Sequence, residues 1–333
     1  MIRDGNTPEA IEEAASVLQA GGLVAFPTET VYGLGADAGS DAAVAGIFSA
    51  KGRPADHPLI VHVAAGTKGT EALSHFAEPL PGFAQKLVRA FWPGPLTLIV
   101  ERRADIAAAA AGGQDTIGLR CPSHPVAQAL LIACAAHGVH GVAGPSANRF
   151  GRVSPTTAQH VREEFGDELL VIDGGPCEVG IESTIVDCSR GVPVLLRPGA
   201  ITRAQVEAAC GEPLRDKEDL AAPDPRASGT LEAHYAPNAK VRLMDAKALQ
   251  AGLEVLGANA AHIAVWSRTP LKSRSQRIVQ RRMPDDAATT AQQLFAVLRA
   301  FDADGVKLIW IENPPDTPEW EGVRDRLQRA AAA

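Results

Sequence analysis

Apolar and polar positions form alternating helix-like and strand-like runs from the start of the chain. Residues 7–20 (TPEAIEEAASVLQA) predict an opening helix, because Thr7 can cap its start and Gly21 can end it. Further helices are expected near residues 41–50, 79–90, 125–136 and 156–165. Short apolar runs predict strands at LVAFPT (23–28), PLIVHV (58–63), PLTLIV (95–100), TIGLR (116–120), GVAGPS (141–146), LLVIDG (169–174), STIVDC (183–188) and PVLLRPG (193–199). This alternation is typical of an α/β sheet with crossover connections.

The composition changes near residue 211. The following stretch is rich in Pro, Gly and charged residues and has no apolar period, which indicates a linker of roughly thirty residues. Beyond it the strand candidates VRLM (241–244), HIAVW (262–266) and VKLIWIE (306–312) alternate with helices expected near 245–256, near 287–301 and at the end of the chain. The order predicts a small parallel, Rossmann-like domain, but no GxGxxG motif indicates a dinucleotide there.

Length and composition agree with two folded domains. The chain has 333 residues, of which 46% are hydrophobic and 21% charged, so a disordered chain is excluded. No apolar run approaches the roughly 20 residues that span a bilayer. The first residues lack the apolar core of a signal peptide, so a cytoplasmic location with no membrane contact is expected.

Charge and cysteine content narrow the classes of function. The formal net charge is −7, whereas duplex-binding proteins usually carry a basic face, so tight nucleic-acid binding is not expected. The five cysteines are scattered and include no CxxC pair. They indicate reduced thiols rather than disulfides or a zinc site, and no metal held by protein side chains is predicted.

Polar residues follow the first predicted strand in PTETVYGLGADA (27–38). Thr28, Glu29 and Thr30 come directly after LVAF, in a stretch predicted to be a loop over Glu29–Gly35. Loops at strand ends are where α/β folds place ligands. A tight turn with capping threonines explains the same residues equally well.

Two cations flank a glycine in SAKGRP (49–54). Lys51 and Arg53 alternate, so in an extended segment both would point to one side and suit a triphosphate or pyrophosphate. A solvated basic patch is the alternative. His57 lies in the following loop, and His62 lies on an apolar strand, where a lone histidine is more often a core residue.

Further polar side chains lie at strand ends and in glycine-rich loops. Arg120 ends a strand candidate, where a guanidinium can pair with the carboxylate of an amino acid. Loop GPSANRFGRVSPTT (144–157) carries hydroxyl and amide groups suited to phosphate or ribose, and turn or cap chemistry is the alternative. No segment fits a nucleophile elbow, a P-loop or a metal box. The pattern predicts an α/β enzyme that handles anions.

Taken in order, the motifs resemble those of the YrdC/Sua5 family, in its longer Sua5-type form. The matching segments are PTETVYGLG, the Lys51-x-Arg53 pair, HPLIVHV, FWPGPLT, GLR, PSAN, GIESTIVD, LLRPG and HYAP (234–237). The resemblance implies a YrdC-like twisted open α/β sheet with a central cavity over residues 1–208. It also implies a linker and lid over 209–238 and a smaller Rossmann-like C-terminal Sua5 domain over 239–333.

The family resemblance also implies a reaction. An L-threonylcarbamoyladenylate synthase of this family condenses L-threonine, bicarbonate and ATP to threonylcarbamoyl-AMP and pyrophosphate. The product serves N6-threonylcarbamoyladenosine (t6A) formation at position 37 of tRNA by a separate transferase, with which a transient contact is expected. A carbamoyl-adenylating enzyme and a double-stranded RNA-binding module of the same fold are the alternatives. The absence of CxxC pairs disfavours the first and the acidic net charge the second.

Site residues follow from the same resemblance, position by position. Lys51 and Arg53 are implied as the catalytic cations. Threonine would be bound by Thr30, His62, Arg120 and Ser183. ATP would be bound by Lys51, Arg53, His57, Thr116, Ser146, Asn148, Ser154, Arg197 and, from the lid, Tyr235. Mg²⁺ is expected with ATP, held largely by the nucleotide and water, with no organic cofactor.

Overall fold

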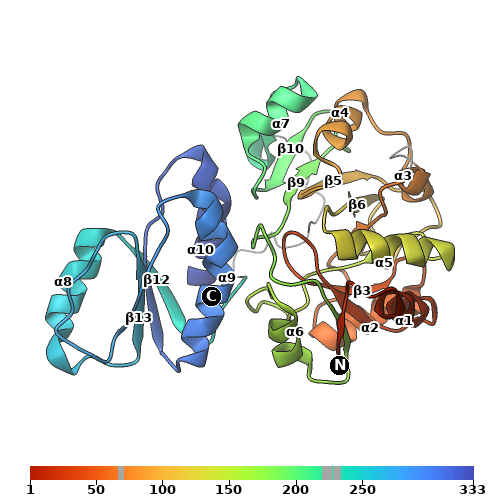
Figure 1. Ribbon diagram of the computed structural model, residues 1–333. Coiled ribbons are helices and arrows are strands. Elements are labelled where there is room, and N and C mark those ends of the chain that lie inside the picture. Colours follow the sequence, from red (N-terminus) through yellow and green to blue (C-terminus); the bar gives the residue numbers. More distant parts are fainter. Residues whose placement is uncertain (67–70, 220–226, 228–233) are drawn as a thin grey trace. The chain divides into compact units, whose positions relative to one another are not determined.

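The computed structural model describes residues 1–66, 71–219, 227 and 234–333 (Figure 1). The chain divides into two compact units. Unit 1 contains Met1–Phe150 and Ser154–Thr230, and unit 2 contains Gly151–Val153 and Leu231–Ala333. Part of the expected linker, including the segment 228–230, lies outside the described residues. The expected limits at 208 and 238 stay predictions.

Unit 1 is built on one mixed sheet. In its described residues the strand order is β1-β8-β2-β3-β7-β4-β6-β5-β9-β10-β11. The strands are β1 (Ile2–Asp4), β2 (Val24–Phe26), β3 (Gly33–Asp37), β4 (Ile60–His62), β5 (Leu96–Glu101), β6 (Thr116–Arg120), β7 (Val142–Ala143), β8 (Leu170–Asp173), β9 (Thr184–Asp187), β10 (Val194–Arg197) and β11 (Arg215–Asp216). Parallel and antiparallel pairs alternate irregularly, so the order could not be derived from the strand pattern.

Helices cover this sheet (Figure 1), and α1 and α5 pack against each other. The helices of unit 1 are α1 (Pro8–Gln19), α2 (Asp41–Lys51), α3 (Glu71–Phe76), α4 (Gly82–Phe91), α5 (Pro125–Ala136), α6 (Ala158–Phe165) and α7 (Arg203–Cys210). Thr7 caps α1 by accepting a hydrogen bond from Ala10 N, as its sequence predicts. The apolar sides of α1 and α5 bury Leu18 and Leu130 completely, so these helices fix the sheet beneath them.

The opening helix and most strand predictions in unit 1 are confirmed to within about two residues, the accuracy that helix and strand ends allow. The predicted loop Glu29–Gly35 is wrong in its second half, because β3 begins at Gly33. Its sequence GLGAD carries two glycines, which hide the strand signal. Gly35 is needed at its position, because a Cβ there would lie 2.8 Å from the side chain of Val142 on β7.

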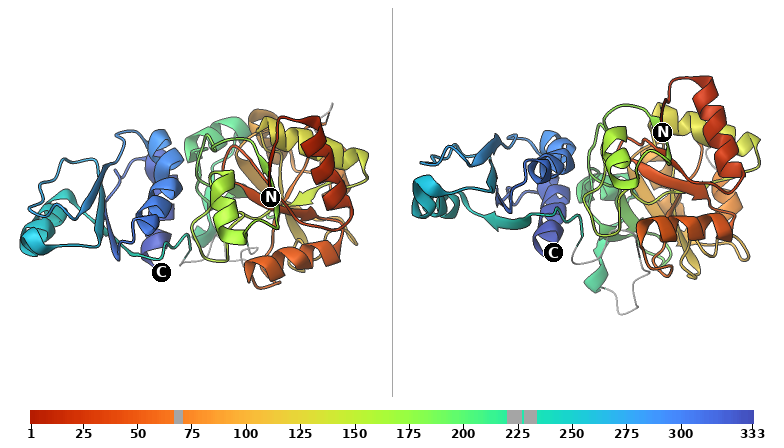
Figure 2. Two further views of the ribbon diagram at one scale, coloured as in Figure 1. Left: turned by 60° about the horizontal axis from the view of Figure 1, so that its bottom comes forward. Right: turned by 90° about the horizontal axis from the view of Figure 1, so that it is seen from below.

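Unit 2 is a small sheet between two helix layers. Its strands β12 (Lys240–Met244), β13 (Ile263–Ser267), β14 (Val279–Arg282) and β15 (Leu308–Glu312) are parallel, in the order β12-β15-β13-β14. Helix α8 (Ala246–Leu256) covers one face, and α9 (Ala287–Ala303) and α10 (Glu321–Ala331) cover the other (Figures 1 and 2). The predicted parallel domain is therefore confirmed. Strand β14 is polar and exposed, so its sequence shows no apolar run.

The cysteines are free thiols, as their scattered spacing predicted. All five cysteines are buried free thiols. Burial raises the pKa of Cys121, next to Arg120 in the chain, to about 11, so this thiol is uncharged at neutral pH. Across the described ranges no helix combines the length and the apolar character that crossing a bilayer requires.

The core position of β5 yields a stability prediction. Leu98 is fully buried in the middle of the sheet, so Leu98→Ala should lower the free energy of unfolding by about 2–5 kcal/mol. The control Ile132→Ala removes an apolar side chain that is 57% exposed, and we expect a change within about 0.5 kcal/mol. Denaturant unfolding of both variants measures the difference. Equal losses would contradict the assignment of Leu98 to the core.

Candidate active site

The polar residues after β2 meet the ends of β4 and β6 inside unit 1. His62 ends β4 and Arg120 ends β6, and the two are register partners in parallel strands. Arg120 Nη1 donates a hydrogen bond to Thr30 Oγ1 at 2.8 Å. All three side chains are at most 3% exposed. Three of the four residues predicted to bind threonine are therefore adjacent.

Glu29 is a functional candidate to which the sequence assigned no role. Its Oε1 lies 2.8 Å from Arg120 Nη2, with both side chains about 5% exposed. Its Oε2 accepts a hydrogen bond from Ser123 N at 3.2 Å. A carboxylate at this distance aims the guanidinium and offsets the cost of burying its charge. The sequence motif PTET includes Glu29, but only the fold shows that its carboxylate pairs with Arg120.

His62 is held as a neutral ring. Burial, reinforced by the charge of Arg120, lowers its pKa to about 3. Its ring packs edge-on against Phe26, with the centroids 5.5 Å apart. A Cβ on Gly144 would come within 3.0 Å of Nδ1, so glycine is what allows the loop of Ser146 to pass this ring. Nδ1 has no hydrogen-bond partner in the described structure and is available to a polar substrate group.

Lys51 and Arg53 both lie inside unit 1, but the backbone conformation that places them there differs from the predicted one. The extended segment is wrong: Lys51 is the last residue of α2, and Gly52 ends the helix with a left-handed φ of 64°. This turn places both cations inside unit 1, where they are 3% and 8% exposed, which excludes the solvated basic patch. Burial and the nearby charge of Arg53 lower the pKa of Lys51 well below its usual range.

The loop after β7 is fixed to these cations. Lys51 Nζ donates hydrogen bonds to Ser146 O at 2.5 Å and to Asn148 O. The guanidinium of Arg53 lies over the ring of Phe150, 5.9 Å from its centroid, and His57 packs edge-on against the same ring at 5.5 Å. Five of the predicted ATP-binding residues therefore form one cluster: Lys51, Arg53, His57, Ser146 and Asn148. Phe150, which connects two of them, was not singled out from the sequence.

A second group of predicted residues surrounds the start of β9. Arg197 Nη2 donates to Ser183 Oγ at 3.1 Å and to Ser183 O at 2.9 Å. Ser183 Oγ lies 2.7 Å from Thr97 Oγ1 on β5, the strand next to β6. Ser154 Oγ donates to the buried carboxylate of Glu182 at 2.5 Å. Thr97 and Glu182 were not predicted, since a lone hydroxyl and a lone carboxylate give no spacing signal.

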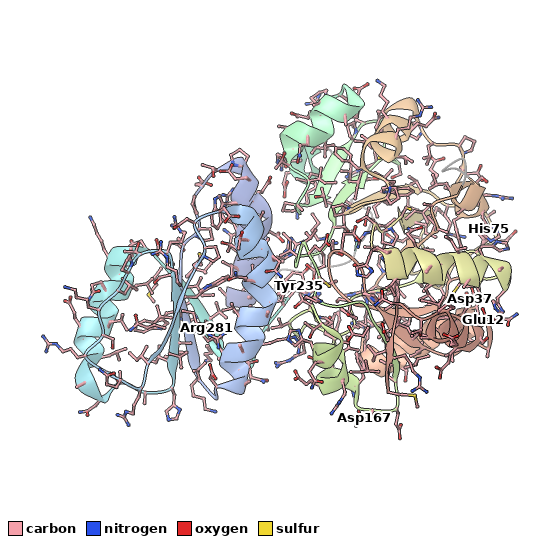
Figure 3. The ribbon with its side chains drawn as sticks, in the orientation of Figure 1. Glu12, Asp37, His75, Asp167, Tyr235 and Arg281 are labelled. Carbon is pink, nitrogen blue, oxygen red and sulfur yellow. The ribbon has the colours of Figure 1, made fainter. Side chains whose placement is uncertain are left out.

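Two predicted site residues remain, Thr116 and Tyr235. Thr116 begins β6, at the opposite end of that strand from Arg120. Tyr235, labelled in Figure 3, belongs to unit 2. Its ring stacks on His234 and lies 5.4 Å from the ring of Phe295 on α9. It is 1% exposed, so it is part of the packing of unit 2. Its contact with a nucleotide stays a prediction.

Charge is the main chemical property of the candidate site. The predicted residues include four buried cations, Lys51, Arg53, Arg120 and Arg197, and no carboxylate. Burial is the main cause of the lowered pKa of Lys51, and the charge of Arg53 lowers it further, because buried charges of one sign raise each other's electrostatic energy. An anionic ligand among them would lower that energy. The donors and hydroxyls suit phosphate oxygens, whereas the described residues contain no cluster of three His, Cys, Asp or Glu side chains that could hold a metal ion by themselves.

A separate cavity of about 790 Å³ lies beside α3 and α4 in unit 1. Apolar side chains such as Leu73, Val88 and Trp92 contribute to its lining. None of the predicted site residues lines it. This cavity therefore does not mark the candidate site.

Comparisons with known protein families agree with this arrangement. The family Sua5_yciO_yrdC, described as "Telomere recombination", matches residues 16–199. The family described as "Threonylcarbamoyl-AMP synthase, C-terminal domain" matches residues 201–332. The two matches together cover the candidate site and nearly all of unit 2.

Individual relatives match over almost the whole chain. A threonylcarbamoyl-AMP synthase from Bacillus subtilis is 37% identical, over 98% of this chain and 94% of its own length. One from Pyrococcus abyssi is 36% identical, over 98% and 96%. A solved structure of P. abyssi Sua5 complexed with L-threonine superposes with a TM-score of 0.84 at 35% identity, covering 96% of this chain and 94% of the other. The chain therefore belongs to the Sua5/YrdC family, in its long form with a Sua5 C-terminal domain.

Proposed function

We propose that this protein is an L-threonylcarbamoyladenylate synthase, a nucleotidyltransferase that joins L-threonine, bicarbonate and ATP. The observation that carries the proposal is the side-by-side burial of Lys51 and Arg53, which repel each other and therefore favour a polyanion between them. The names of the relatives, and the L-threonine bound to one of them, support the same reaction.

Arg120 would bind the threonine carboxylate. Its side chain is already aimed by Glu29 and by Thr30, so binding requires little reorganisation. The neutral ring of His62 would accept or donate one hydrogen bond through Nδ1 without adding a charge. Ser183 would complete the pocket from β9.

The chemical step needs no covalent intermediate on the protein. The threonine amine adds to bicarbonate-derived carbon dioxide and loses a proton, which gives a carbamate. A carbamate oxygen attacks the α-phosphorus of ATP, the bond to the β-phosphate breaks, and pyrophosphate leaves. Lys51, Arg53 and Arg197 would stabilise the charge that develops on the phosphate oxygens. The protein contributes position and positive charge.

Mg²⁺ would accompany the triphosphate and neutralise part of its charge. The residues of the site fit this role, because they offer cations and hydroxyls to the phosphates and leave the metal to phosphate oxygens and water. The product would serve t6A formation at position 37 of tRNA through a separate transferase. Contact with that transferase would be transient, without tight binding of nucleic acid by this chain.

Pyrophosphate release tests the proposed reaction. With ATP and Mg²⁺, release should require both L-threonine and bicarbonate. Lys51→Ala should reduce the rate by about 100-fold or more, because it removes a buried cation beside the reacting phosphate. Lys86→Ala is the matched control, since that lysine donates a hydrogen bond to Cys210 O, far in sequence from the predicted site residues, and its rate should stay within about twofold. Release that is indifferent to threonine would refute the synthase.

Gly52 provides a test of how the two cations are positioned. Gly52→Ala puts a side chain at a φ of 64°, and Gly138→Ala does the same at 83° after α5, with open space around both positions. Each should lower the free energy of unfolding by about 1 kcal/mol. Only Gly52→Ala should also slow pyrophosphate release, by about tenfold, because it displaces Arg53 relative to Lys51. Equal activity in the two variants would contradict this positioning role.

The lowered pKa of His62 predicts the pH dependence of threonine binding. A ring with a pKa of about 3 stays neutral between pH 5.5 and 8, so the affinity for threonine, measured by calorimetry, should be constant over that range. A histidine at its usual pKa of 6.5 would instead gain a proton as the pH falls through 6.5 and repel the threonine ammonium group. A fall in affinity below pH 6.5 that His62→Asn removes would show that the ring is not held neutral.

A further inference from the structure

The hydroxyl of Thr28 fixes the turn that follows β2 in unit 1. The residue is 2% exposed, and its Oγ1 donates a hydrogen bond to Val31 O at 2.7 Å. The same oxygen accepts hydrogen bonds from the amides of Thr30 and Val31, both at 3.2 Å. Threonine side chains stabilise turns through bonds of this kind. The backbone of Thr30, a residue predicted to bind threonine, is therefore held by Thr28.

The hydroxyl hydrogens of Thr28 and Thr30 can be assigned from their contacts. The two Oγ1 atoms lie 2.9 Å apart, so one of them donates to the other. A hydroxyl carries a single hydrogen, and that of Thr28 is already donated to Val31 O. Thr30 is therefore the donor of this pair, and its hydrogen points at Thr28.

This assignment leaves the oxygen of Thr30 as an acceptor. One of its two acceptor positions receives the hydrogen bond from Arg120 Nη1 at 2.8 Å. The second position is left for a bound molecule, whereas the hydroxyl hydrogen is already used. Thr30 Oγ1 can thus accept a hydrogen bond from a ligand without being able to donate one.

The place of this acceptor beside Arg120 suits the amino group of an amino acid. The carboxylate and the amino group of an α-amino acid are attached to the same carbon atom. A carboxylate bound by Arg120 therefore brings the amino group close to Thr30. The ammonium group of threonine and the N–H of its carbamate are both hydrogen-bond donors, so one acceptor serves both.

Further bonds within unit 1 hold the turn in this position. Glu29 O accepts a hydrogen bond from Val179 N at 2.8 Å, and Tyr32 N donates to Pro155 O at 2.9 Å. The backbone on both sides of Thr30 is thus fixed. The direction of its hydroxyl then depends on the partner that Thr28 provides.

We propose that Thr28 is a positioning residue of the threonine site: by accepting the hydroxyl hydrogen of Thr30, it makes Thr30 an acceptor for the amino group of L-threonine. The proposal rests on the proposed function, because it takes threonine as the ligand of Arg120. It gives the site a means to select a ligand that has an amino group over one that has only a carboxylate and a hydroxyl.

Thr28→Val tests the proposal, because valine keeps the branched shape and removes the hydroxyl. Calorimetry should show that the Kd for L-threonine rises by about tenfold, the value of one hydrogen bond to a charged group. The Kd for (R)-3-hydroxybutanoate, which is threonine without its amino group, should stay within about twofold. In the pyrophosphate assay the KM for ATP should also stay within about twofold. Thr28→Ser, which retains the hydroxyl, should recover most of the affinity for threonine.

Hydrogen exchange tests the turn independently of any reaction. Without ligands, the amides of Thr30 and Val31 should exchange faster in Thr28→Val than in the unaltered protein, because both lose their acceptor. Unchanged exchange would overturn the anchoring role of Thr28 whether or not the proposed reaction is correct. If Thr28→Val does not fold, Thr28→Ala is measured in its place, with the same criteria.

Thr290→Val is the matched control in unit 2. Its hydroxyl is equally buried and donates to a backbone oxygen, Asp286 O, at 2.8 Å. The variant should leave the affinities for both ligands and the exchange of Thr30 and Val31 unchanged. An equal loss of affinity for threonine and (R)-3-hydroxybutanoate in Thr28→Val would overturn the assignment of Thr30 to the amino group.

Discussion

The burial of like charges is the constraint on which the candidate site depends. Lys51, Arg53, Arg120 and Arg197 are all less than 9% exposed within one unit. Bringing cations out of water is costly, and the cost grows when they lie near one another. The structure lowers it locally, as with the carboxylate of Glu29 beside Arg120 and the carbonyls of Ser146 and Asn148 around Lys51. The part of this electrostatic cost that these groups do not offset favours a ligand that carries several negative charges.

The mixed sheet brings these charges together from separate segments of the chain rather than from one continuous motif. Strands β4 and β6 run parallel and end in His62 and Arg120, while β10 ends in Arg197. Helix α2 delivers Lys51 at its last residue, and the left-handed Gly52 turns Arg53 inward. Each side chain is therefore fixed at the end of a regular element, where the backbone is held by its hydrogen bonds. Such rigid placement suits a reaction in which position and charge do most of the catalysis.

The elements of unit 1 were largely predictable because their apolar runs are strong, but their neighbours in space were not. Strand β3 was hidden by its glycines and β14 by its polar sequence. The pair Lys51 and Arg53 was found for a wrong reason, since an extended segment was expected where a helix ends. Glu29 and Thr97 gained their significance only from the fold, because the chain separates each of them from its partner by about 90 residues.

The proposed function requires one site to join threonine, bicarbonate and the adenylate of ATP. Mass spectrometry of the small-molecule products, formed with ¹³C-labelled bicarbonate, tests it directly. The expected product contains threonine, one labelled carbon and AMP, and it forms in equal amount with pyrophosphate. Formation of ADP and phosphate, or an adenylate of threonine that carries no labelled carbon, would contradict it.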